Sequence, residues 1–141
     1  MSRIFLDTNF FIYVLEGAGR HAARTQQLLR AFAARKDEVM TSVMSLGEVL
    51  VGPLYHGDHA LAQRYRQMMR TSGITILPFV EQATESFARI RAGGAIKSPD
   101  AIQLATAGHA GCDLFLTNDE RLTGVRVKGI QFITSFDRAP V

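Results

Sequence analysis

Apolar residues in this chain follow two alternating patterns. Five short, nearly continuous apolar runs rich in β-branched and aromatic residues predict strands at residues 3–7, 38–42, 74–79, 113–116 and 131–134. Between them, apolar positions recur with helical spacing and predict helices at residues 10–16, 21–36, 45–55, 60–70, 81–91 and 99–110. The chain therefore alternates strands with helices along most of its length.

This alternation determines the predicted fold class. Strands separated by helices require right-handed crossovers, which give a parallel sheet with helices on both faces. We therefore predict an α/β fold, a three-layer α/β/α sandwich around a central, mostly parallel four- to five-stranded sheet, as one domain over residues 1–141. In such folds the functional crevice lies at the carboxyl ends of the strands. Residues 137–141 follow the last strand, and we expect them to be loosely attached.

Four carboxylates fall where such a sheet collects side chains at one edge. Asp7 ends the first strand, and Asp119 follows the fourth. Glu48 lies in the first turns of the helix after the second strand, and Asp100 lies in the first turn of the helix that leads into the fourth. All four are expected at the carboxyl edge, whereas Asp113 begins the fourth strand and belongs to the opposite edge.

Each carboxylate also has an ordinary structural explanation. Asp7 is a suitable helix N-cap, and Asp119 is a common turn former. The helix dipole favours a negative charge at Asp100, and simple exposure to water would account for Glu48. Four such coincidences at a single edge are less expected than a functional cluster. Because clustered carboxylates repel one another and hard cations prefer carboxylate oxygen, we predict one or two divalent cations there, Mg²⁺ or Mn²⁺.

The charge of the chain gives a second indication. There are 16 Lys and Arg against 13 Asp and Glu, a formal net charge of +3. If four acids hold metal, 9 acids (13 minus 4) remain to face the 16 basic residues. The remaining surface is then clearly basic, which favours a polyanionic partner such as nucleic acid. An Arg-rich, solvated surface without such a partner is the alternative.

The composition argues against several other classes of protein. No apolar run approaches the length of a membrane span, and the first strand starts too close to Met1 for a signal peptide. The lone Cys112 rules out an internal disulfide and fits a reducing cytoplasm, where we expect the protein to act. The histidines are too scattered for a zinc site. No Gly-rich loop follows the first strand, as a nucleotide-binding Rossmann fold would require.

Four segments of the chain together resemble the PIN-domain ribonucleases, and in particular the VapC-type toxins of toxin–antitoxin pairs. They are Ile4-Phe5-Leu6-Asp7-Thr8-Asn9, Ser42-Val43-Met44-Ser45-Leu46-Gly47-Glu48, Asp100-Ala101-Ile102-Gln103-Leu104-Ala105-Thr106-Ala107 and Leu116-Thr117-Asn118-Asp119. Each segment alone is a weak signal, whereas the ordered set covers essentially the whole chain. The resemblance implies the same three-layer α/β/α sandwich.

The resemblance also implies an activity and its partners. The activity is that of a metal-dependent endoribonuclease, the toxin of a type II toxin–antitoxin module, which hydrolyses phosphodiester bonds in structured tRNA or rRNA. The implied partners are the RNA substrate, a cognate VapB-like antitoxin that covers the acidic site, and a second copy of the chain in a homodimer. The implied catalytic and metal-binding residues are Asp7, Glu48, Asp100 and Asp119. The implied supporting residues are Thr8, Asn9, Thr117 and Asn118, of which Asn118 is also an alternative to Asp119.

These residues are expected to divide the work. Asp7 and Asp100 would be the main direct ligands, and Asp119 would bind directly or through water. Glu48 would bind a second ion or orient the attacking water. The basic residues expected to meet RNA phosphates at this edge are Arg20, Arg24, Lys97 and Arg121. Two apolar segments, 10–15 and 50–55, are candidate partner surfaces, with plain core as the alternative for much of each.

Two other functions remain open on the residues alone. A phosphatase or phosphotransferase would use Asp7 as a covalent nucleophile, but no second Asp stands two residues further on. A non-catalytic binding module would keep the PIN fold only as a scaffold. Retention of all four acids argues against that second function.

Overall fold

The computed structural model describes residues 1–17 and 19–140. Within these residues, five strands form one parallel sheet in the order β3-β2-β1-β4-β5. The strands are β1 (Arg3–Leu6), β2 (Glu38–Ser42), β3 (Thr75–Leu77), β4 (Cys112–Leu116) and β5 (Ile130–Thr134). The central strand β1 pairs with β2 on one side and with β4 on the other, so the ends of these three strands lie together.

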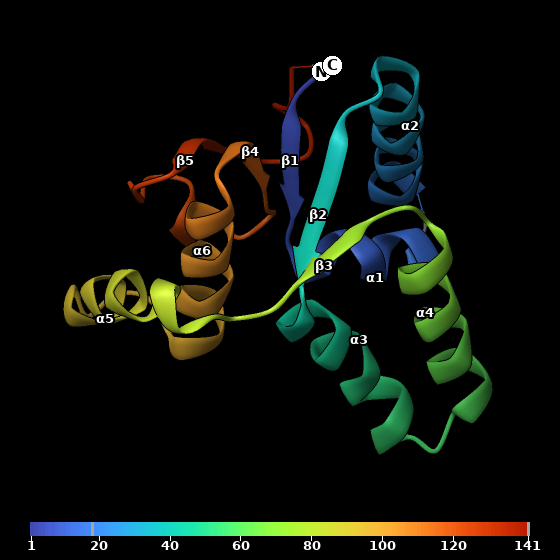
Figure 1. Cartoon of the computed structure of the whole chain (residues 1–141). Coiled ribbons are helices and arrows are strands. Elements are labelled where there is room, and N and C mark those ends of the chain that lie inside the picture. The colour runs from blue at the N-terminus through green and yellow to red at the C-terminus, as the bar shows by residue number, and fades with distance from the viewer. Residues whose placement is uncertain (18, 141) are drawn as a thin grey trace.

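The helices cover both faces of the sheet (Figure 1). One face is covered by α1 (Thr8–Glu16) and α2 (Gly19–Arg35), together with parts of α3 (Val43–Tyr55) and α4 (His59–Thr71). The other face is covered by α6 (Ser98–Ala110), and α5 (Thr84–Ala92) packs against α6 on the side away from the sheet. Two short 3₁₀ helices complete the described chain, η1 (Glu81–Ala83) and η2 (Glu120–Leu122). The three-layer sandwich predicted from the sequence is confirmed.

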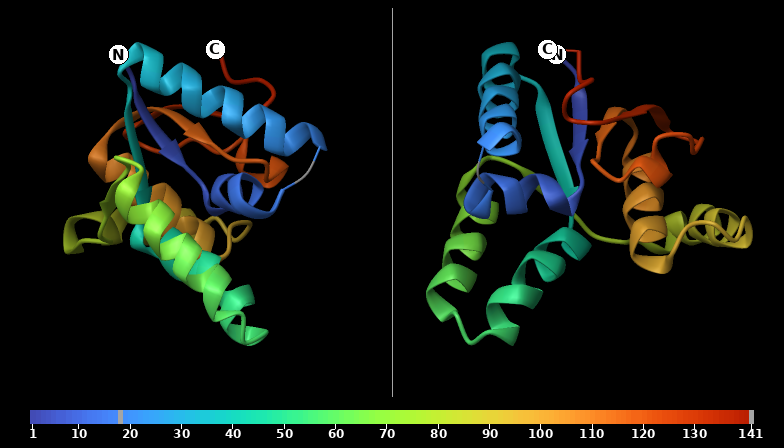
Figure 2. Two further views of the ribbon diagram at one scale, coloured as in Figure 1. Left: turned by 90° about the vertical axis from the view of Figure 1, so that its right-hand side faces the viewer. Right: turned by 180° about the vertical axis from the view of Figure 1, so that it is seen from behind.

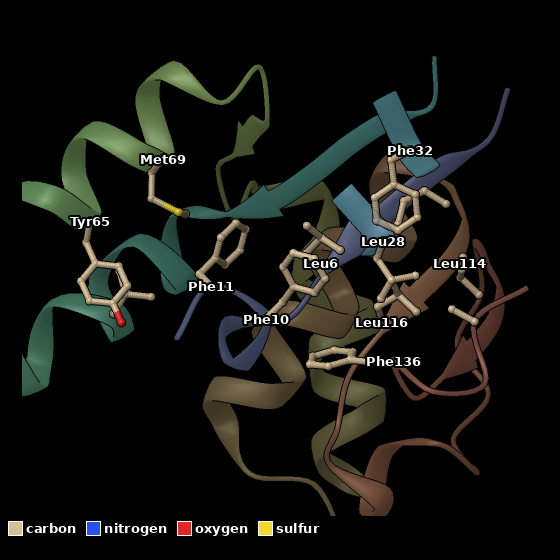
Figure 3. Close-up of a cluster of buried hydrophobic side chains, with 13 residues drawn as sticks. Leu6, Phe10, Phe11, Leu28, Phe32, Tyr65, Met69, Leu114, Leu116 and Phe136 are labelled. Carbon is tan, nitrogen blue, oxygen red and sulfur yellow. The ribbon is translucent and has the colours of Figure 1, made fainter. Parts of the chain in front are cut away.

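Side chains of the central strands point alternately to the two faces of the sheet, so the core has two halves, one on each face. On β1, Ile4 and Leu6 face α1 and α2, whereas Phe5 between them faces α6, because successive side chains of a strand point to opposite sides. Phe5 stacks on Phe115 of β4, with ring centroids 5.1 Å apart. Figure 3 shows the buried cluster on the α1 and α2 side of the sheet, the first core cluster, in which Leu6 lies close to Phe10. Both faces are buried, which explains why these strands are continuous apolar runs.

Helices α3 and α4 form a hairpin that extends beyond the carboxyl edge of the sheet (Figures 1 and 2). Tyr65 and Met69 of α4 are fully buried and attach the hairpin to the first core cluster. The Tyr65 hydroxyl donates a hydrogen bond to Glu16 at the end of α1. No helix in the described part of the chain combines the length and apolar character that a membrane span requires.

The segment after β5 is anchored, so the expectation of loose attachment is wrong for residues 137–140; Val141 lies outside the described residues. Phe136 and Ala139 are buried. Arg24 of α2 donates hydrogen bonds to the carbonyl oxygens of both, at 2.9 Å and 3.1 Å. Arg24 thus satisfies two backbone carbonyls of this segment, while two apolar side chains fix it to the core.

At the opposite edge of the sheet, α6 touches the turn before β5 backbone to backbone. A Cβ on Gly129 would overlap the Gly108 carbonyl, and a Cβ on Gly108 would overlap the Lys128 carbonyl. Gly129 also has a φ of +94°, which side chains of other residues disfavour. Two glycines therefore set how closely α6 approaches β5.

Candidate active site at the carboxyl edge of the sheet

Asp7 is the centre of the polar cluster at the carboxyl edge. Its backbone N–H bonds to the Leu116 carbonyl, which continues the pairing of β1 with β4. Its carboxylate caps α1 by accepting from the Thr8 N–H at 2.8 Å, and it accepts from the Thr117 hydroxyl at 2.7 Å. The side chain is only 6% exposed. Burial raises the pKa of Asp7, the two hydrogen bonds oppose this rise, and the nearby charge of Glu48 adds to it.

Glu48 reaches Asp7 through Thr8. The Thr8 hydroxyl donates to Glu48 Oε1 at 2.6 Å and lies 3.1 Å from the Ser45 hydroxyl. Ser42 caps α3 at the end of β2, which directs the first turns of α3, with Ser45 and Glu48, toward the start of α1. The cap and the strand order together place Glu48 at the predicted edge.

Gln103 is a member of this site that the sequence analysis missed. It is 1% exposed, and its amide nitrogen donates to Ser45 Oγ at 2.7 Å and to Thr8 Oγ1 at 3.2 Å, with Asp7 Oδ1 at 3.4 Å. Its amide oxygen accepts from the Ser42 hydroxyl. Gln103 therefore links α6, α1 and α3 in one buried hydrogen-bond network. The available signal was its position one turn after Asp100, as a polar residue between the buried Ala101 and Leu104.

Asp100 and Asp119 are the other two predicted carboxylates. Asp100 occupies the first turn of α6, and Asp119 caps η2 just after β4. Arg121 binds Asp119 through two hydrogen bonds, Nε to Oδ1 at 2.9 Å and Nη2 to Oδ2 at 2.6 Å. The same Nη2 lies 3.9 Å from Asp100. Arg121 thus brings one positive charge to two of the four predicted carboxylates.

The titration of these two groups differs because their surroundings differ. Burial raises the pKa of Asp100, and repulsion from Asp7 and Asp119 raises it further, against the attraction of Arg121 and Lys97. The hydrogen bond from Arg121 lowers the pKa of Asp119. Asp100 interacts electrostatically with both Asp7 and Asp119, and Asp7 with Glu48, so all four carboxylates belong to one connected cluster.

The predicted supporting residues separate into two groups. Thr8 and Thr117 contact the carboxylates directly, and the Thr117 hydroxyl also accepts from the Asp119 N–H at 3.0 Å. Asn9 is exposed on α1. Asn118 turns to the other side of β4, where its amide nitrogen lies 3.5 Å from His21 Nδ1 and its oxygen accepts from the Phe136 N–H. Asn118 therefore makes no hydrogen bond to the four acids.

The predicted basic residues also differ in their roles. Arg121 lies within the cluster, and Lys97 is close enough to affect Asp100. The guanidinium of Arg24 is bound to the backbone of the segment after β5, so the structure gives it a structural role in place of the predicted phosphate contact. Arg20 is exposed and lies 3.5 Å from Asp137.

Comparison with known families identifies this arrangement. The family model of the PIN domain matches residues 4–128, which is most of the chain and includes all four carboxylates. The chain belongs to the PIN domain family. No curated protein matches the sequence of this PIN domain.

Several solved structures with this fold come from toxin–antitoxin systems. VapBC2 from Rickettsia felis, bound to a promoter DNA fragment, matches at 17% identity and a TM-score of 0.76, covering 94% of this PIN domain and 98% of that chain. A toxin–antitoxin complex from Klebsiella pneumoniae matches at 26% identity and a TM-score of 0.68, covering 90% and 94%. VapC20 from Mycobacterium tuberculosis is described as a sarcin–ricin loop cleaving toxin. It matches at 19% identity and a TM-score of 0.68, covering 89% of this PIN domain and 98% of that chain.

The four carboxylates of this PIN domain interact electrostatically, but they are not arranged as a preformed metal site. Within residues 1–17 and 19–140, no group of three or more Asp, Glu, His or Cys side chains is placed to hold a metal ion as it stands. Two of the four carboxylates are engaged by neighbouring side chains, Glu48 by the Thr8 hydroxyl and Asp119 by the Arg121 guanidinium. Chemically, the edge offers carboxylate oxygens, two threonine hydroxyls and one guanidinium, which are groups suited to a cation and to a phosphate.

Proposed function

We propose that this PIN domain is a metal-dependent endoribonuclease and the toxin of a type II toxin–antitoxin pair. The observation that carries the proposal is the gathering of acids at the carboxyl edge, where Thr117 links Asp7 to Asp119 and Arg121 links Asp119 to Asp100. The raised pKa of Asp100, caused by burial and by repulsion from Asp7 and Asp119, agrees with it. A protein tolerates such repulsion where the charges are needed for binding or chemistry. Membership of the PIN family supports a nuclease, and the toxin structures with the same fold support the toxin role.

A divalent cation fits the donor set. Asp7 and Asp100 present carboxylate oxygens, the ligands that Mg²⁺ and Mn²⁺ prefer, and Arg121 already brings a positive charge to the same place. We propose Mg²⁺ or Mn²⁺, as one or two ions, with Asp7 and Asp100 as the main ligands and Asp119 as a ligand after Arg121 moves away. When bound, such an ion lowers the pKa of a water and stabilises negative charge on phosphate oxygens.

The side chains around these ligands would orient the reaction. Glu48 is held by the Thr8 hydroxyl at 2.6 Å, which fixes one carboxylate oxygen and leaves the other to accept a hydrogen bond from an attacking water. Thr117 fixes Asp7 from the opposite side at 2.7 Å. Arg121 is more than half exposed, so its guanidinium is free to turn from Asp119 to a phosphate of the RNA.

We propose structured RNA, tRNA or rRNA, as the substrate class. The description of VapC20 as a sarcin–ricin loop cleaving toxin supports a loop as the target. Proteins read RNA mainly at loops, whose bases are unstacked and accessible. We place this activity in the cytoplasm, where a lone buried cysteine such as Cys112 stays reduced.

The proposed partners are a VapB-like antitoxin and a second copy of the chain. Of the two candidate surfaces, the first is partly core, since Phe10 and Phe11 are buried. The second lies on the α3–α4 hairpin, where Val51, Leu54 and Tyr55 are all exposed. An exposed apolar patch of this kind favours a protein partner. Three of the similar solved structures are described as VapBC, which supports the antitoxin.

A covalent Asp7 nucleophile receives less support. Both Asp7 oxygens accept hydrogen bonds and the side chain is almost fully buried, so neither oxygen is presented to a phosphate. A nucleophile needs an accessible atom and a neighbouring base. An ionised carboxylate has about four lone-pair sites, so Asp7 can still bind a small cation while it accepts these hydrogen bonds.

The proposed function is tested by cleavage of total cellular RNA with the purified protein. The reaction is run with Mg²⁺ or Mn²⁺, with EDTA, and with Asp100→Asn and Asp113→Asn in parallel. Asp113 is the matched control, because it is exposed at the opposite edge of the sheet and contacts the Arg3 N–H. We expect discrete products that EDTA and Asp100→Asn abolish and Asp113→Asn preserves. Equal cleavage by both variants would rule out the acidic cluster as the active site.

A further inference from the structure

A cavity of about 820 Å³ lies beside the acidic cluster, at the carboxyl ends of β4 and β5. Tyr13 of α1 and His21 of α2 line one side, and Asn118 and Ser135 line the other. Asn118 stands in the chain between Thr117 and Asp119, two residues of the acidic cluster. Cavities of this size hold small organic ligands up to the size of a nucleotide or larger. The cavity and the acidic cluster are therefore neighbours at the same edge of the sheet.

Two aromatic rings that line this cavity stack on each other, which leaves the outer faces of the pair for a further planar group. The rings of Tyr13 and His21 have centroids 4.8 Å apart and planes inclined by 21°. Tyr13 packs edge-on against the buried Phe136, and the Asn118 amide lies 3.5 Å from the His21 ring, so both rings are held in place. Both side chains are half-buried and keep part of their surface open. Such a preformed pair of planar rings is suited to stack on a nucleic-acid base.

The charges around the cavity favour a nucleotide over a free anion. Two basic residues line it, Arg20 and Arg138, but so do two acidic residues, Glu120 and Asp137. Arg20 and Asp137 already pair at 3.5 Å. A balanced lining attracts a simple anion weakly. It offers donors for a phosphate together with acceptors for the amino groups of a base.

The position of the rings matches a strand that passes over the acidic cluster. Asp7 caps α1 and Tyr13 lies six residues further along the same helix, so the two are separated by about 9 Å along its axis. At the stacked spacing of about 3.4 Å per nucleotide, that distance corresponds to roughly two to three nucleotides. An RNA with its scissile phosphate at the acidic cluster would therefore bring a flanking base to the rings.

We propose that this cavity is a subsite for one nucleotide of single-stranded RNA, roughly two to three positions from the scissile bond, with its base stacked on the Tyr13–His21 pair. The inference rests on the proposed nuclease function and names the part of its substrate that the protein recognises. Arg20 and Arg138 bind the phosphates of that nucleotide, and Asn118 fixes His21. The subsite gives the enzyme a preference for one or two bases at that position.

Binding of nucleotides without metal tests the subsite separately from cleavage. AMP, GMP, CMP and UMP are each titrated into ¹⁵N-labelled protein in EDTA, and ribose 5-phosphate serves as a ligand without a base. We expect at least one nucleotide to shift the amide signals of His21, Asn118 and Ser135 saturably, and ribose 5-phosphate to bind at least fivefold more weakly. Absence of these shifts, or equal binding of ribose 5-phosphate, overturns the subsite even if the protein cleaves RNA.

Variants of His21 then test whether its ring binds the base. We expect His21→Ala to weaken nucleotide binding at least fivefold, and His21→Phe to keep the binding because a planar ring remains. The control is His59→Ala, at an exposed histidine at the start of α4, which should leave nucleotide binding unchanged. In RNA digests, His21→Ala is expected to broaden the base preference at one flanking position while metal-dependent cleavage continues. Unchanged binding and unchanged preference in His21→Ala would overturn the proposal. Nucleotide binding by a protein that cleaves no RNA would support the subsite while refuting the proposed nuclease.

Discussion

The Arg121 guanidinium contacts both carboxylate oxygens of Asp119, at 2.9 Å from Oδ1 and 2.6 Å from Oδ2. The same side chain lies 3.9 Å from Asp100. Arg121 therefore occupies the place at which a cation would reduce the repulsion between these acids. A divalent ion and Arg121 are expected to compete for Asp119.

Replacing Arg121 should therefore strengthen metal binding. In Arg121→Gln, Asp119 loses its counter-ion and becomes available as a ligand. Exposed ion pairs contribute up to about 1 kcal/mol, so we expect the Kd for Mn²⁺ to fall by up to roughly fivefold, measured by calorimetry. Arg35→Gln is the matched control, because Arg35 binds Asp37 two residues away through the same two nitrogens at the opposite edge. Equal Mn²⁺ affinity in the two variants and the wild type would contradict the competition.

The buried charge of Asp7 should make the metal-free protein less stable at neutral pH. Burial raises the folded-state pKa above the unfolded value of 3.8, so above pH 3.8 the native state holds the proton more strongly and stability falls as the pH rises through the folded pKa. Asp7→Asn should therefore raise the Tm at pH 7, by roughly 4 °C for each kcal/mol recovered. Below about pH 3.8 the two proteins should converge.

Added Mg²⁺ provides the control for that measurement. A ligand that binds only the native state stabilises it, so Mg²⁺ should raise the Tm of the wild type more than that of Asp7→Asn. Differential scanning calorimetry in EDTA and in Mg²⁺, at pH 7 and at low pH, separates the two effects. A lower Tm of Asp7→Asn in EDTA at pH 7 would show that the hydrogen bonds of Asp7 outweigh its desolvation.

Gln103 should contribute strongly to stability although it bears no charge. Gln103→Met keeps the volume but removes the donor to Ser45 and Thr8 and the acceptor for Ser42. Buried hydroxyls without partners cost about 1–3 kcal/mol, so we expect a loss of roughly 2 kcal/mol in urea unfolding. Gln63→Met, at an exposed position of α4, should change stability by less than about 0.5 kcal/mol. Similar unfolding midpoints for both variants would show that the network is dispensable.

Thr8 should affect cleavage through Glu48. Thr8→Val preserves the shape of the side chain but removes the 2.6 Å hydrogen bond to Glu48. Hydrogen bonds to charged groups contribute about 1.5–3 kcal/mol, so single-turnover cleavage should slow by roughly tenfold to a hundredfold. Thr8→Ser keeps the hydroxyl and should remain close to the wild-type rate. If Thr8→Val cleaves as fast as Thr8→Ser, the orientation of Glu48 by Thr8 is unimportant.

The sequence was sufficient to predict most strands and helices and the edge of the sheet at which the acids lie. Apolar runs marked β1 and β4, and the order of strands and helices placed Asp7 and Asp119 at the same ends. Helix starts were less certain. We expected α1 to begin at Phe10, whereas it begins at Thr8, because the Asp7 side chain caps the Thr8 N–H. Asp7 is thus both a helix cap and a member of the cluster, so the two explanations offered for it do not exclude each other.

Side-chain partners were beyond the sequence pattern. Nothing in the spacing of Arg121 showed that it would bind Asp119, because both residues follow β4 in a turn whose shape depends on η2. Arg24 was expected to contact an RNA phosphate, but the segment after β5 packs beside α2, and Arg24 donates hydrogen bonds to its backbone carbonyls. Contacts of this kind depend on tertiary geometry, which periodicity does not report.

The close contact between Gly108 and Gly129 has a consequence for genetics. Asp100 and Gln103 are carried by the same rigid helix as Gly108, so a larger residue at either glycine would tilt or shift α6 and displace both. Random mutagenesis followed by selection for loss of function should therefore recover alleles at positions 108 and 129, at the edge farthest from the acids. Such alleles would map as a second, separate cluster of lesions, although they would disturb the same four carboxylates.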